Sequence, residues 1–164
     1  MIAVDLSLLA YAVNRHAPEH PRAAAAMDAL VNGDRGWALP WPVVHEFLEL
    51  VTHPHAAPRP LGAMDAVGYV TALLESPSGV ALGATARHAA VCAELLAAIE
   101  PVGRVPRGLA VAAVLREHGV RELLSADASM RRFGFLSVID PLHGEAWKPG
   151  GPPPRRYRRL ERSR

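Results

Sequence analysis

The chain has 164 residues, of which 50% are hydrophobic and 21% charged, so it has the size and composition of one folded domain. Its one cysteine, Cys92, excludes an intramolecular disulfide and a zinc site built from four thiolates. No hydrophobic run approaches the ~20 residues that cross a bilayer, and residues 1–5 lack the pattern of a signal peptide. We therefore expect no membrane association and a cytoplasmic location.

The formal net charge of +2 conceals two parts of opposite sign. Residues 148–164 contain seven basic side chains and one acidic side chain, which leaves the rest of the chain acidic. The stretch 148–154 reads Lys-Pro-Gly-Gly-Pro-Pro-Pro, which is typical of a linker, and the Arg-rich segment after it has few apolar side chains. We predict one domain over residues 1–147 and a basic, disordered tail over 148–164. The tail either follows a phosphate backbone or serves only as a solubilising end.

Short hydrophobic runs alternate with helical patterns along the domain. In chain order we predict a strand over 1–4, helices over 8–13 and 21–31, a strand over 37–39, helices over 42–52 and 61–74, a strand over 80–82, helices over 86–99 and 109–118, and strands over 122–125 and 136–139. Ser7 and Thr85 are the predicted caps of two of these helices. Trp37 and Trp41, on either side of the second strand, are expected in the core. Strands that alternate with helices predict an α/β fold in which helices cover both faces of a parallel sheet of about five short strands.

Three acidic residues lie where such a fold forms sites. Asp5 and Asp127 follow predicted strands, whose carboxyl ends meet at one edge of the sheet, and Glu46 lies on the polar side of a predicted helix. Clustered carboxylates repel one another, and their hard oxygens favour Mg²⁺ or Mn²⁺ over zinc. Such an ion activates water and stabilises charge on a phosphodiester. Spacing alone leaves a structural alternative open, because acids after strands also form turns and cap helices.

Several segments resemble the PIN-domain ribonucleases of the VapC toxin type, in order and in spacing. They are Val4-Asp5 with Leu8-Leu9-Ala10-Tyr11-Ala12, the stretch 36–47 continued by 51–54, Glu117-His118-Gly119, Ser125-Ala126-Asp127, Arg132-Phe133, and Asp140-Pro141-Leu142. The resemblance covers residues 1–142, and the stretch from 36 is its most specific part. It implies a PIN-like α/β/α sandwich and a Mg²⁺- or Mn²⁺-dependent endoribonuclease, usually the toxin of a type II toxin–antitoxin pair.

The resemblance also implies partners and residue roles. Asp5, Glu46 and Asp127 carry over as catalytic and metal-binding acids, with Ser125 in place of the family's threonine and Ser7 in place of its asparagine. The implied partners are an RNA substrate, a VapB-type antitoxin whose C-terminal segment covers the acidic site, and a second copy of the chain in a homodimer.

Two arginines lie about one helical turn after Asp127. Arg131 and Arg132 are predicted to support the substrate by attracting RNA phosphates toward the acids; the alternative is that they are ordinary surface charges.

One family acid is missing. The family has an aspartate at the start of the helix that ends in Glu117-His118-Gly119, and counting back nine residues from Glu117 reaches Gly108. No acid lies between Glu100 and Glu117, and a frequent further aspartate falls on Ser129. Loss of a ligand predicts weak metal binding and low or absent activity. The alternative function is a catalytically inactive PIN-fold protein that binds antitoxin or RNA, and Gly108→Asp is the substitution that restores an acid there.

Overall fold

The fold is built on one sheet of five parallel strands. The computed structural model describes residues 1–56, 59–99, 103–143 and 146–150. The strands are β1 (Ile2–Val4), β2 (Trp37–Pro40), β3 (Gly79–Leu82), β4 (Glu122–Leu124) and β5 (Ser137–Ile139), in the spatial order β3-β2-β1-β4-β5. The helices are α1 (Leu6–Val13), α2 (His20–Val31), α3 (Trp41–Thr52), α4 (Ala63–Leu74), α5 (His88–Ile99) and α6 (Leu109–Glu117), and η1 (Ala128–Arg132) is a 3₁₀ helix. The predicted α/β fold with a parallel sheet is confirmed.

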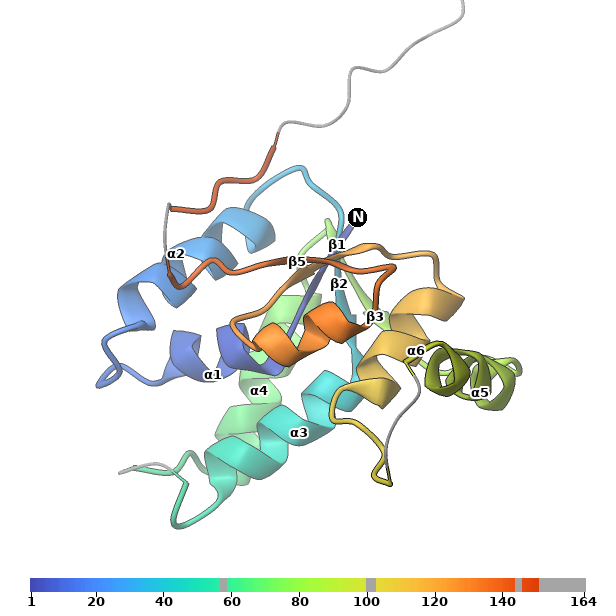
Figure 1. Ribbon diagram of the computed structural model, residues 1–164. Helices are drawn as coiled ribbons and strands as arrows, with labels where there is room; N and C mark the ends of the chain where they lie inside the picture. The colour runs from blue at the N-terminus through green and yellow to red at the C-terminus, as the bar shows by residue number, and fades with distance from the viewer. Residues whose placement is uncertain (57–58, 100–102, 144–145, 151–164) are drawn as a thin grey trace, which may run out of the picture.

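Helices flank the sheet on both sides (Figure 1). The pair α1 and α2 lies on one side of the strands, and α5 and α6 lie on the other. Helix α3 contacts both α1 and α6, so it joins the two layers where the strands end. The strand order reverses between β1 and β4, which is where open parallel sheets form their sites.

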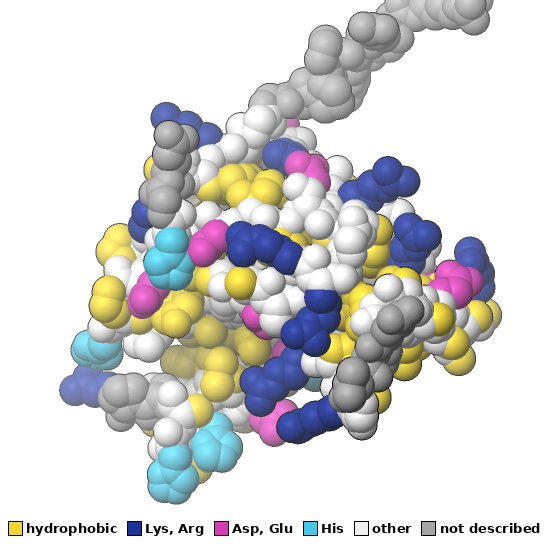
Figure 2. Space-filling model, in the orientation of Figure 1, with side chains coloured by type: hydrophobic (Ala, Val, Ile, Leu, Met, Phe, Trp, Pro, Cys, Tyr) yellow, Lys and Arg dark blue, Asp and Glu magenta, His cyan; other side chains and the backbone are white. Residues whose placement is uncertain are grey.

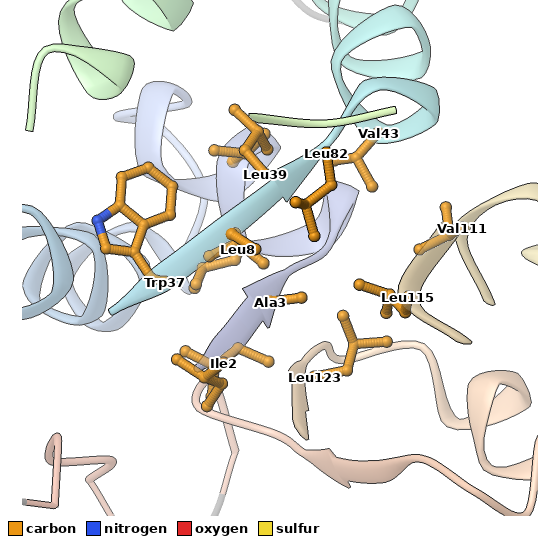
Figure 3. Close-up of a cluster of buried hydrophobic side chains, with 14 of the residues drawn as sticks. Ile2, Ala3, Leu8, Trp37, Leu39, Val43, Leu82, Val111, Leu115 and Leu123 are labelled. Atoms are coloured by element: carbon orange, nitrogen blue, oxygen red, sulfur yellow. The ribbon is translucent and has the colours of Figure 1, made fainter. Parts of the chain in front are cut away.

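The hydrophobic core fills both faces of β1 and β2 (Figure 3). Leu8 of α1 packs from one helical layer, while Val111 and Leu115 of α6 point toward the strands from the other. Trp37 is fully buried, as predicted, but Trp41 is 43% exposed, and the expectation that it lies in the core is wrong. Trp41 is the first residue of α3, and its ring lies beside the exposed His45, with ring centroids 5.8 Å apart, instead of on the buried side of the helix.

A buried carboxylate fixes the junction of α5 with α6. The Glu117 side chain is 1% exposed and accepts hydrogen bonds from the Thr85 backbone N–H at 3.1 Å and from His88 Nδ1 at 2.7 Å. Partial desolvation opposes ionisation, but these hydrogen bonds and the nearby imidazole lower the pKa of Glu117 below its usual value. Thr85 caps the turn that precedes α5, and the helix begins at His88, two residues later than predicted.

Two further sequence predictions concern membrane spans and the basic tail. No helix among the described residues is long and apolar enough to span a membrane. The predicted tail lies outside the described residues from position 151 onward, so its disorder stays a prediction.

Candidate active site

The ends of β1 and β4 bring two of the predicted acids to one place. Asp5 directly follows β1, and its backbone N–H donates to the Leu124 carbonyl at 3.0 Å. The Ser125 hydroxyl donates to the Asp5 carboxylate and accepts from the Asp127 backbone N–H at 2.9 Å. One serine therefore fixes the positions of both acids relative to each other.

Ser7 supports the same junction from α1. The helix begins at Leu6, one residue before the predicted cap, so Ser7 lies within its first turn. Its hydroxyl accepts from the Ala126 backbone N–H at 3.0 Å and connects α1 to the loop after β4. Ser7 and Ser125 thus position the acids, and their predicted support of a substrate stays a prediction.

Asp5 is a buried carboxylate with an unfavourable environment for its charge. It is 7% exposed, and burial is the main reason why its pKa is raised above the usual value. The charge of Asp127 raises the pKa further, whereas hydrogen bonds from Ser125 and the Leu6 backbone lower it. A cation beside Asp5 would relieve this repulsion.

Asp127 is more exposed and caps the 3₁₀ helix that follows it. Its Oδ1 accepts from the Ser129 backbone N–H at 2.8 Å, which turns the chain into η1. Within the described part of the chain, Oδ2 of Asp127 accepts no hydrogen bond, so this oxygen remains available as a ligand.

Glu46 reaches the site from α3. Pro42 lies in the first turn of this helix, and Val43, Val44 and Phe47 pack into the core, which leaves Glu46 on the opposite, cleft side. Burial raises the pKa of Glu46, and the charge of Asp5 raises it further.

The three acids line one end of a large cleft, with a volume of about 1380 Å³. Tyr11, Leu61 and Tyr69 add apolar surface to its walls, which also carry further charged side chains such as Asp65 and Arg59. Figure 2 shows this recessed hydrophobic surface between α1 and α3, with basic side chains along the middle of the same face.

The donor set fits one hard divalent cation. It consists of carboxylate oxygens, and Asp5 is the acid close enough to interact electrostatically with both others. In the described residues no three His, Cys, Asp or Glu side chains form a ready-made metal site. If an ion binds in this cleft, Asp5 and Asp127 are the residues that would hold it, with Glu46 acting through water.

Gly108, at the position of the missing family acid, lines the cleft with the three acids but leaves little room for a side chain. It precedes α6 in the left-handed backbone conformation, with φ +78°, which residues other than glycine rarely adopt. A Cβ placed there would overlap the sulfur of Met130 and lie 3.2 Å from its methyl carbon. A side chain at 108 would thus be directed at the core residue Met130.

Sequence reasoning missed a basic side chain of this cleft that interacts electrostatically with Glu46. Arg107 lines the cleft together with the three acids, and its positive charge opposes the rise of the Glu46 pKa that burial and Asp5 cause. The only signal in the sequence is a basic residue directly before the position of the missing acid.

The two arginines that were predicted to support the substrate lie elsewhere. Neither Arg131 nor Arg132 is among the described residues that line the acidic cleft. Arg132 donates from Nε to the Ser129 carbonyl at 3.0 Å and lines a separate hollow of about 350 Å³ beside Phe133 and Phe135. Their role toward a substrate stays a prediction.

A parallel α/β/α sandwich with carboxylates gathered where the strand order reverses defines a protein of the PIN-like class. No family model matches the chain. Ribonuclease VapC33 of Mycobacterium tuberculosis is 33% identical over 142 residues, which is 87% of this chain and 99% of that protein. Ribonuclease VapC48 of the same species is 26% identical over 140 residues, which is 85% of this chain and 97% of the relative.

A solved structure has a similar fold. The crystal structure of VapBC2 from Rickettsia felis, bound to a DNA fragment from its promoter, superposes with a TM-score of 0.62 at 15% identity. The match covers 85% of this chain and 98% of that one. The chain belongs to the VapC ribonuclease family, as the resemblance of its sequence predicted.

Proposed function

We propose that the protein is a metal-dependent endoribonuclease, the toxin of a VapBC-type pair, that cleaves RNA at the cleft lined by Asp5, Glu46 and Asp127. The observation that carries the proposal is that Asp5 and Asp127, after β1 and β4, line one cleft with Glu46 of α3 in a member of the VapC family.

Each residue has a defined part in this proposal. Mg²⁺ or Mn²⁺, when bound, supplies an activated water and positive charge beside the phosphodiester. Asp5 and Asp127 hold the ion, and Ser125 keeps the Asp5 carboxylate oriented toward it. Glu46 accepts a hydrogen bond from water in the cleft. Water attack in line with the leaving oxygen gives a product with a 5′-phosphate.

Metal affinity is expected to be low. Three acids with an arginine beside them attract a divalent ion less strongly than four acids would, so cleavage should need ion concentrations near the millimolar range. The proposal therefore includes the predicted weak metal binding. It does not include a loss of activity, because Asp5 and Asp127, the two acids that Ser125 connects, are both present.

The proposed protein partner is a VapB-type antitoxin. The R. felis structure carries VapB and VapC in its name, and the cleft of this chain combines carboxylates with apolar surface. A segment with apolar side chains and a basic residue would match both. We also propose a homodimer, which light scattering of the purified protein checks directly.

The test is a ribonuclease assay with Mg²⁺ or Mn²⁺ on the wild-type protein and two variants. Asp5→Asn keeps the size of the side chain but removes its charge. Asp34→Asn removes an exposed acid that does not line the cleft and is the matched control. We expect cleavage by wild type and Asp34→Asn, and none by Asp5→Asn or in EDTA. Equal activity of wild type and Asp5→Asn would refute the proposal, and no cleavage by any of them would support the inactive alternative.

A further inference from the structure

Arg107 is a cation in an acidic cleft, and the described residues give it no ion-pair partner. The ion pairs of the described chain are Arg35–Glu122, His88–Glu117 and His143–Asp140. Arg107 is exposed, lines the cleft with the three acids, and is close enough to Glu46 to affect it electrostatically. Its guanidinium is therefore available to a ligand that enters the cleft.

The backbone on both sides holds Arg107 in place. Pro106 is buried and the proline ring fixes its φ angle, while Gly108 turns the chain into α6 through its left-handed conformation. This turn directs position 108 at Met130 and leaves the side chain of position 107 on the cleft. Arg107 thus lines the acidic cleft at the position directly before the missing fourth acid.

The charges of the cleft show what this guanidinium is able to do. The cleft is lined by five carboxylates and three guanidinium groups, which leave two negative charges for a single divalent ion to neutralise. Nucleases with two ions use the second one to stabilise charge that develops on the phosphodiester. A planar guanidinium with paired donors is well suited to bind the same phosphate oxygens.

We propose that Arg107 is a substrate-binding residue of the active site, whose guanidinium donates hydrogen bonds to a nonbridging oxygen of the RNA phosphodiester held at the acids. The inference rests on the proposed ribonuclease function. It assigns to a side chain the charge stabilisation that a second metal ion would otherwise provide.

The experiment compares Arg107→Gln, Arg107→Lys and the control Arg104→Gln with wild type. Arg104 is an exposed arginine of the same loop that does not line the cleft. Affinity for a short RNA is measured by fluorescence anisotropy in EDTA, where no cleavage occurs, over a range of salt concentrations. Cleavage kinetics are measured with Mn²⁺, and Mn²⁺ affinity is measured by electron paramagnetic resonance without RNA.

Three results are expected for Arg107→Gln. Its RNA affinity falls, and the slope of log affinity against log salt decreases by about one. Its kcat/KM falls about 100-fold, because the lost contact strengthens in the transition state. Its affinity for Mn²⁺ rises about threefold or more, because a positive charge has left the acidic cleft. Arg107→Lys recovers part of the cleavage, and Arg104→Gln behaves like wild type.

The rise in Mn²⁺ affinity separates this role from simple structural damage, which would weaken metal binding and RNA binding together. If wild type cleaves RNA while Arg107→Gln matches Arg104→Gln in RNA affinity and kcat/KM, the role of Arg107 is overturned and the proposed function stands. If wild type cleaves no RNA with either ion, both are overturned.

Discussion

A side chain at Gly108 should destabilise the fold and should not supply a metal ligand. For Gly108→Ala, a left-handed residue with a Cβ costs about 1–2 kcal/mol. The overlap with Met130, which is 2% exposed and held in the core, adds about 1–3 kcal/mol of overpacking. We therefore expect a loss of about 3 kcal/mol in the free energy of unfolding, which for a chain of this length lowers Tm by about 6–12 °C.

Urea denaturation of Gly108→Ala and of a control glycine variant measures this loss. Gly134→Ala is the matched control, because a Cβ there meets nothing within 4 Å and its φ is not left-handed, so its stability should change by less than about 0.5 kcal/mol. In a Met130→Ala background the overlap is gone, and Gly108→Ala should then cost only the backbone part, about 1–2 kcal/mol. Equal costs in both backgrounds would show that Met130 is not the obstacle.

Gly108→Asp, which restores the missing acid, meets the same obstacle at Met130. Aspartate tolerates a left-handed φ better than alanine, but its carboxylate would start from a Cβ that is directed at Met130. Gly108→Asp should therefore lower Tm without improving cleavage at low Mg²⁺. A stable Gly108→Asp protein that cleaves faster than wild type at low Mg²⁺ would refute this account of the site.

Three further predictions follow from other contacts. A Cβ at Gly79 would lie 2.7 Å from the buried Trp37 ring, so Gly79→Ala should lose about 1–3 kcal/mol in urea denaturation, whereas Gly36→Ala, with nothing within 4 Å, should lose far less. Hydrogen bonding lowers the pKa of Glu117 in the folded protein below 4.5, so the stabilisation by its charged form is present above about pH 4.5 and is lost as the pH falls through the folded pKa. The difference in stability between wild type and Glu117→Gln should therefore shrink as the pH is lowered over that range. Mn²⁺ should raise the Tm of wild type but not of Asp5→Asn, and in EDTA Asp5→Asn should melt above wild type, because it lacks the buried charge.

The elements and the meeting of the acids could be predicted because they depend on patterns local to the sequence. Helical spacing identified the six helices among the described residues, with differences of a few residues at their ends, and the positions after strands β1 and β4 identified Asp5 and Asp127. Because β1 and β4 are adjacent parallel strands, the sheet brings Asp5 and Asp127 together, although the residues next to each of them in the sequence give no sign of this contact.

The parts that could not be predicted depend on the direction of single side chains. Counting along the chain reached Gly108, but only the fold shows that a Cβ there would meet Met130 and that Arg107 lines the cleft. Arg132 was placed near the acids by helical spacing, but η1 is a 3₁₀ helix, and the side chain lines another hollow. Trp41 was expected in the core because it flanks the second strand, but that position does not define the side of α3 on which its ring lies.

The hydrogen bond between Ser125 and Asp5 joins residues that are 120 positions apart in the sequence. Contacts of such long range form late in folding, because a long loop must close before they contribute. A chain released before β4 is made would contain Asp5 and Glu46 but neither Asp127 nor the serine that orients Asp5. Termination of synthesis before β4 would therefore yield fragments without this site, and any toxicity to the cell that makes the protein would begin only with chains that extend past Asp127.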